Sequence, residues 1–196
     1  MQSDQLVYRI VNTPIGPFVV GATAKGCCVC EFEDRGGLEK IKTRLEKRYG
    51  LKPVSGSCEL VDRLAGELGE YFAGDRTTFT GPLDLRGTRF EKSVWAELLN
   101  IPFGETSSYG RMAEKLGKPG GARAVGRANG ANSLAIVIPC HRVIQENGEL
   151  RGYGGGLWRK RWLLDHERAV AGGVQSFGTK GLSIPVDSAT ARSQQT

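Results

Sequence analysis

The sequence is poor in several residue types, and each shortage excludes a class of protein. Only two histidines occur among 196 residues, His141 and His166, beside five cysteines. Three of the cysteines cluster at Cys27, Cys28 and Cys30, but this spacing is not the Cys-x-x-Cys of a zinc site. We therefore expect no bound metal. An odd number of cysteines without a regular pattern also argues against a secreted, disulfide-bonded scaffold.

Long apolar runs and targeting signals are missing as well. No stretch approaches the roughly 20 apolar residues that cross a bilayer. Residues 1–10, MQSDQLVYRI, lack the basic and apolar regions of a signal peptide. No internal repeat and no cofactor-binding fingerprint is present. We expect a monomer without a cofactor or a membrane partner, in a reducing compartment such as the bacterial cytoplasm or the nucleus.

Charge is distributed unevenly along the chain. The net formal charge is +6, of which residues 1–85 carry −1 and residues 86–167 carry +5. A basic second half suits a polyanionic partner such as DNA. A solvated basic surface is the simpler explanation of the charge taken alone.

The first 80 residues predict a small α+β domain. Residues 6–12, 17–23 and 27–33 are β-rich and separated by turn signals, which indicates an antiparallel sheet. Apolar residues then recur at helical spacing in 38–50 and again from Leu60 to Phe72. We expect an RNase H-like arrangement of sheet and helices, ending in a linker at 76–88.

The second half, 81–170, predicts a mainly helical domain. Helical patterns cover 89–101, 108–117, 122–132 and 157–167, with Ser108 as an N-cap. The apolar run LAIVI, residues 134–138, suits a buried strand. From residue 171 to 196 there are few apolar residues and no periodicity, which predicts a disordered tail.

The helices within 108–130 are short and joined by a glycine-containing turn, as in a helix-turn-helix. The second helix is mostly alanine and glycine and lacks the long side chains that read base edges in the major groove. Its small face and isolated arginines suit the minor groove, whereas close packing in a core explains the alanines equally well. The expected DNA-contacting residues are Ala122, Arg123, Ala124, Gly126 and Arg127.

The segment IPCHRV, residues 138–143, places a cysteine beside a histidine. A thiolate is a strong nucleophile, and a nearby base lowers the pKa of a thiol. Neighbours on an extended strand point to opposite faces, so either the chain turns at Pro139 or a water links Cys140 to His141. Glu167 is a candidate to orient the imidazole. GYGGG, residues 152–156, is either a plain loop or backbone that approaches a ligand closely.

These segments together resemble the O6-alkylguanine-DNA alkyltransferases. The resemblance is strong over residues 86–167 and looser over the first 80. The motifs that carry it stand in the family's order and are SY at 108–109, ARAVG at 122–126, Asn132, PCHRV at 139–143, GYGGG at 152–156 and LLDHE at 163–167.

The resemblance implies single, irreversible transfer of an alkyl group from O6 of guanine, and from O4 of thymine, in double-stranded DNA to Cys140. It implies that His141 acts as the base through a water and that Glu167 orients it. Asn132 would brace the turn, Tyr109 would assist the departing guanine, and Arg123 would fill the stack after the nucleotide flips. Lys160 matches a lysine near the active site in some members. The residues implied to line the guanine pocket are Pro139, Val143, Tyr153, Gly154 and Gly155.

Three other functions compete with alkyl transfer. A non-catalytic alkylated-base recognition protein is disfavoured because Cys140 is present. A transcription regulator is disfavoured because 120–130 lacks base-reading side chains. A Cys-His hydrolase would turn over esters or amides. Within the alkyltransferase interpretation, the all-glycine loop at 154–156 predicts a pocket open to larger alkyl groups.

Overall fold

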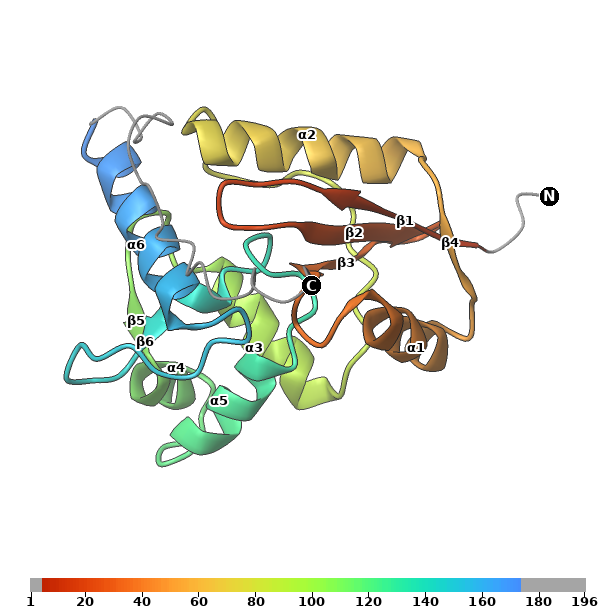
Figure 1. The fold of residues 1–196 in the computed structure, drawn as a ribbon. Helices are drawn as coiled ribbons and strands as arrows, with labels where there is room; N and C mark the ends of the chain where they lie inside the picture. The colour runs from red at the N-terminus through yellow and green to blue at the C-terminus, as the bar shows by residue number, and fades with distance from the viewer. Residues whose placement is uncertain (1–4, 174–196) are drawn as a thin grey trace, which may run out of the picture.

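The structure, a computed structural model, describes residues 5–173 and centres on a four-stranded sheet (Figure 1). The predicted antiparallel meander is present as β1 (Leu6–Val11), β2 (Phe18–Thr23) and β3 (Gly26–Phe32). The sequence analysis did not predict the fourth strand, β4 (Pro53–Ser55), which pairs parallel with β1 and makes the sheet mixed. Three residues that begin with proline are too short to show an alternating pattern.

Two helices cover opposite faces of the sheet (Figure 1). The helix α1 (Leu38–Tyr49) packs through Ile41 and Leu45 on the face that includes Val19, and it ends at the left-handed Gly50. The helix α2 (Glu59–Ala73) packs on the other face, which includes Phe18 and Val20. Because both faces are covered, every residue of β2 and β3 is buried.

The second half is mainly helical, as predicted. Its first helix opens with a capping box between Thr88 and Glu91. Ser108 caps the next helix by accepting from the backbone N–H of Arg111 at 3.1 Å. The elements in chain order are α3 (Arg89–Leu99), β5 (Ser107–Ser108), α4 (Tyr109–Lys115), α5 (Ala122–Gly130), a 3-10 turn η1 (Cys140–Arg142), β6 (Val143–Ile144) and α6 (Leu157–Ala171).

The two halves share one hydrophobic cluster, which joins Phe18 and Val20 of the sheet to Val94 of α3 and to Leu134. The division near residue 80 stays a prediction. The predicted tail lies outside the described residues from 174 onward, and 171 is still part of α6. Within 5–173, no helix is both long and apolar enough to cross a membrane.

The predicted strand at 134–138 was wrong, although these residues are buried. Asn132 accepts from the backbone N–H of Leu134 at 2.9 Å and donates to the carbonyl of Ile138 at 2.9 Å. The backbone of Ile138 in turn donates to Leu134, and Ile136 has a φ of 71°. The segment keeps one parallel bridge to β3, between Leu134 and Cys30. The Asn132 amide satisfies the backbone groups of Leu134 and Ile138, and the apolar run folds into a compact loop instead of a strand.

Candidate active site

Cys140 begins the short 3-10 turn η1 directly after Pro139. The backbone N–H of Cys140 donates to Ile138, and that of Arg142 donates to Pro139 at 3.0 Å. The chain therefore turns at Pro139. Cys140 and His141 are therefore not placed on opposite faces of a strand. The Cys140 side chain is buried, with the residue 6% exposed.

His141 contacts the carboxylate predicted to orient it. Its Nε2 lies 2.8 Å from Oε1 of Glu167, and both side chains are fully buried. The other ring nitrogen, Nδ1, is buried and has no hydrogen-bond partner within residues 5–173. An ionised carboxylate only accepts hydrogen bonds, so Nε2 carries a proton toward Glu167, and in the neutral imidazole the lone pair is then on Nδ1.

Besides His141, three residues donate hydrogen bonds to the carboxylate of Glu167. Arg142 donates twice, from Nε at 2.8 Å and Nη2 at 3.0 Å. The Tyr71 hydroxyl on α2 donates at 2.9 Å, and the backbone N–H of Gly104 donates at 3.1 Å. Burial raises the pKa of this carboxyl, but His141 and Arg142 outweigh burial and hold the pKa far below its ordinary value. Glu167 is therefore ionised.

Two asparagines hold the turn in place. Asn132 donates to the carbonyl of Ile138, two residues before Cys140. Asn129, near the end of α5, donates from Nδ2 to the carbonyl of Cys140 at 3.2 Å. The sequence analysis did not identify Asn129, although its position three residues after Gly126 places both on one helix face.

Burial raises the pKa of the Cys140 thiol, while the Asn132 amide and the charges of Arg35 and Lys160 lower it in part. Lys160 is fully buried, and its ammonium donates to the carbonyls of Val143 at 2.6 Å and Arg151 at 2.8 Å. Burial lowers the pKa of Lys160 to about 8. The net balance leaves Cys140 a neutral thiol at neutral pH, which needs a base before it can attack.

Tyr109, the first residue of α4, lies beside Cys140 and Lys160. Its hydroxyl donates to the carbonyl of Arg151 at 3.3 Å, and its ring covers Gly126 of α5, where a Cβ would lie 3.8 Å from two ring atoms. Burial and the neighbouring Cys140 raise the pKa of Tyr109, so the phenol keeps its proton at neutral pH.

The glycine loop at 152–156 packs tightly. A Cβ on Gly155 would lie 2.3 Å from the Phe32 ring, and one on Gly154 would lie 2.6 Å from Cζ of Arg35. Tyr153 places its ring edge-on to Phe32, and its buried hydroxyl has no partner within residues 5–173. Since Arg35 fills the space beside Gly154, the glycines alone give no argument for larger alkyl groups.

Arg35 reaches this region from the loop after β3. Its Nη2 donates to the carbonyl of Gly130 at 2.8 Å and its Nη1 to that of Asn132 at 3.4 Å. The sequence analysis missed Arg35 because its partners lie almost 100 residues away. Through it, the first half of the chain contacts the end of α5, the Asn132 turn and the glycine loop.

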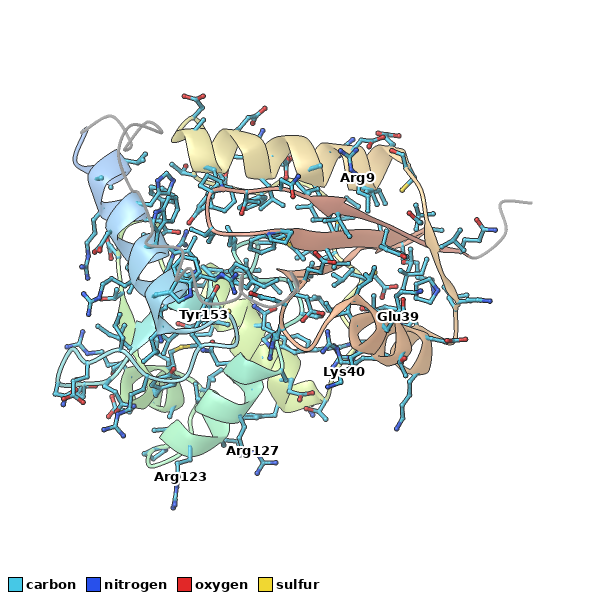
Figure 2. The ribbon with its side chains drawn as sticks, in the orientation of Figure 1. Arg9, Glu39, Lys40, Arg123, Arg127 and Tyr153 are labelled. Carbon is cyan, nitrogen blue, oxygen red and sulfur yellow. The ribbon has the colours of Figure 1, made fainter. Side chains whose placement is uncertain are left out.

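The helix α5 has two distinct faces. Val125, Ala128 and Asn129 are buried against the core. Arg123 and Arg127 are exposed and point away from the body of the molecule (Figure 2). In the part of the chain that the structure describes, neither arginine side chain forms a hydrogen bond or ion pair. Of the other residues predicted on this surface, Ala124 is exposed, and Ala122 and Gly126 are half-buried.

Comparison with known proteins identifies the family. The family model described as 6-O-methylguanine DNA methyltransferase, DNA binding domain, matches residues 89–169. A methylated-DNA–protein-cysteine methyltransferase of Mycobacterium tuberculosis is 44% identical over 164 residues, which are 84% of this chain and 93% of that protein. One from Shigella flexneri is 53% identical over 172 residues, covering 83% and 96%. The chain belongs to this methyltransferase family.

Solved structures of methyltransferases agree with the fold described above. The crystal structure of the M. tuberculosis O6-methylguanine methyltransferase has a TM-score of 0.73 at 42% identity and covers 84% of this chain and 94% of that one. The same protein in complex with DNA has a TM-score of 0.72 with the same coverage. In this methyltransferase, no three His, Cys, Asp or Glu side chains within residues 5–173 are grouped as a metal site.

Proposed function

We propose that this protein repairs DNA by moving an alkyl group, such as methyl, from O6 of guanine to Sγ of Cys140. The observation that carries the proposal is a buried group of three side chains. Cys140 and His141 lie on a turn held by α5, the helix that also presents Arg123 and Arg127, and Glu167 of α6 contacts His141. The named activity of the relatives is consistent with it.

The charges and protons of the site account for each step. A proton leaves the Cys140 thiol for Nδ1 of His141, which is free to accept it, through a water as the link. The thiolate attacks the alkyl carbon, an S–C bond forms, and the C–O6 bond breaks. The electron pair stays on the base, where a hydrogen bond from Tyr109 relieves the developing charge. Lys160 adds a positive charge near the sulfur.

The product explains why the reaction occurs once. A thioether is not hydrolysed under ordinary conditions, so Cys140 stays alkylated and each molecule acts on one lesion. The same buried site requires the damaged nucleotide to leave the duplex. We propose that α5 lies in the minor groove and that Arg123 fills the stack left by the flipped base. The other residues of α5 proposed to contact the groove are Ala122, Ala124, Gly126 and Arg127.

Several finer assignments belong to the same proposal. Pro139, Val143, Tyr153, Gly154 and Gly155 surround the flipped base. Residues 1–80 and 81–170 act as two domains in one monomer, and O4 of thymine is a second substrate. Because the compared relatives are bacterial, the bacterial cytoplasm is the proposed location. A non-catalytic recognition protein is the weaker alternative, because such a protein does not need a cysteine nucleophile beside a buried histidine and carboxylate.

Mass spectrometry tests the proposal directly. After incubation with duplex DNA containing O6-methylguanine, the peptide with Cys140 should gain one methyl group, with at most one per protein molecule. Cys140→Ala should abolish the gain and still bind DNA. Cys58→Ala, at a half-buried cysteine of the first half, is the matched control and should react like the wild type. An unmodified Cys140 after complete incubation would refute the proposal.

A further inference from the structure

Arg159, in the first turn of α6, joins the glycine loop at 152–156 to the first half of the chain. The residue is only 8% exposed. Its Nη1 donates to the carbonyl of Gly155 at 3.1 Å. Its Nε donates at 2.8 Å to the carbonyl of Ile15, which lies between β1 and β2. One buried guanidinium therefore connects the glycine loop to the central sheet.

Asp34, in the loop after β3, fixes the direction of this guanidinium. Its two carboxylate oxygens accept from Nη1 of Arg159 at 2.9 Å and from Nη2 at 2.8 Å. This two-point contact matches the planar fork of an arginine and restricts its orientation. The hydrogen bond from Arg159 also holds the pKa of Asp34 below its ordinary value, so the carboxylate is ionised at neutral pH.

The guanidinium also lies over the ring against which the glycine loop packs. Cζ of Arg159 is 4.2 Å from the centroid of the Phe32 ring. A Cβ on Gly155 would lie 2.3 Å from the same ring, so the loop is already at its closest approach to Phe32. The hydrogen bond from Arg159 to Gly155 opposes movement of the loop in the other direction. The position of the loop is therefore fixed both toward the sheet and away from it.

The glycine loop lies beside the reacting groups. Burial and the neighbouring Cys140 raise the pKa of Tyr153, the second residue of the loop. A Cβ on Gly152 would lie 3.7 Å from the Tyr109 hydroxyl oxygen. Since the loop is proposed above to surround the flipped base, its position decides how much room is left for the alkyl group at Cys140.

We infer that the ion pair between Arg159 and Asp34 limits the size of the alkyl group that this protein accepts, because it holds the glycine loop against Phe32. Both are positioning residues, which act through the loop. The inference rests on the proposed function, since it requires an alkylated base beside Cys140. Breaking the ion pair should release the loop and favour a bulky alkyl group relative to methyl.

The test compares two alkyl groups on the same base. Single-turnover rates of transfer are measured with duplexes that carry O6-methylguanine or O6-benzylguanine, with protein in excess over DNA. Asp34→Asn should raise the ratio of the benzyl rate to the methyl rate by about 3-fold over the wild type, the effect of losing one partly exposed ion pair. Asp165→Asn is the matched control, because Asp165 is an exposed aspartate that pairs with Arg168 within α6. This control should keep the wild-type ratio.

A double-mutant cycle shows whether Asp34 acts through Arg159. Arg159→Met removes the charge and keeps an unbranched side chain, and it should raise the ratio at least as much as Asp34→Asn. Adding Asp34→Asn to Arg159→Met should then leave the ratio unchanged, because the ion pair is already lost. A further rise in the double variant would overturn the inference.

The ratio of rates separates positioning of the loop from support of the fold. If the ion pair only stabilises the protein, Asp34→Asn slows both transfers equally and keeps the wild-type ratio, which overturns the inference. Asp34→Asn removes a charge from a side chain that is 60% exposed, so this comparison does not depend on how well Arg159→Met folds. A wild type that transfers neither alkyl group refutes the proposed function and the inference together.

Discussion

Nε2 of His141 lies 2.8 Å from Oε1 of Glu167, and neither side chain is exposed to solvent. The carboxylate also accepts two hydrogen bonds from Arg142. The buried negative charge of Glu167 therefore interacts both with His141, the proposed base, and with the guanidinium of Arg142. Such an arrangement tolerates loss of a partner poorly, because the remaining charge stays buried.

Glu167→Gln should lower the free energy of unfolding by about 3–5 kcal/mol, because Arg142 would keep an uncompensated buried charge. Urea denaturation at neutral pH measures the change. Asp165→Asn, exposed on the same helix, is the control and should change stability by less than about 0.5 kcal/mol. The pKa of Glu167 is depressed in the folded state, so its contribution is complete above its ordinary value of 4.5 and lost as pH falls below it. The difference between wild type and variant should shrink on acidification, and a constant difference would contradict the assignment.

Tyr71→Phe should cost about 1.5–3 kcal/mol, because it removes a buried hydrogen bond to the ionised Glu167 from α2. The variant also tests whether the first half of the chain supports the site. Tyr8→Phe is a matched control, since within the described residues the Tyr8 hydroxyl has no hydrogen-bond partner. Equal stability of the two variants, measured by denaturation, would show that the Tyr71 contact contributes nothing.

Gly155→Ala should destabilise the protein by about 1–3 kcal/mol, because its Cβ would lie 2.3 Å from the Phe32 ring and force the core to move. Gly66→Ala, in the middle of α2 with nothing within 4 Å of the added Cβ, should instead stabilise by about 0.5–1 kcal/mol. Thermal unfolding of both variants checks the opposite signs. A neutral Gly155→Ala would indicate that the glycine loop is not held against the core.

Local signals predicted local structure well. Helical spacing with Gly50 located α1 and its end, and Ser108 was correctly taken as a cap. The resemblance also paired His141 with Glu167 across 26 residues, and the contact is present. These features depend on short-range backbone preferences or on a motif whose members have fixed roles.

The features that were missed depend on contacts between distant segments. Tyr71 reaches Glu167 across 96 residues, and Arg35 reaches Gly130 across 95. Such contacts leave no periodic pattern in the sequence, because the residues around each side chain follow the pattern of their own helix or loop and carry no sign of a partner almost 100 residues away. The strand predicted at 134–138 failed for a related reason. Its apolar composition is correct for burial, but the Asn132 side chain takes the backbone hydrogen bonds that a strand would need.

The free protein should show slow, pH-dependent reactivity at Cys140. Its thiol pKa lies above the ordinary 9.0, so the thiolate fraction and the rate of alkylation by iodoacetamide should rise steadily from pH 7 through pH 9. The charge of Lys160 lowers that pKa, so Lys160→Met should shift the profile to higher pH. Mass spectrometry of the Cys140 peptide follows the rate. A plateau below pH 9 in the wild type would contradict the neutral thiol.

Arg127→Ala should weaken binding to unrelated DNA duplexes to a similar extent, because a phosphate contact carries no sequence information. If Arg127 neutralises one phosphate, the negative slope of log K against log salt should become less steep by about 0.9 in the variant. Titration of a labelled duplex at several salt concentrations measures the slope. Lys52→Ala is the control and should leave the slope unchanged, because Lys52 is exposed and directly precedes β4, a strand that lies away from α5 in Figure 1. Equal slopes for Arg127→Ala and the wild type would place the DNA on another surface.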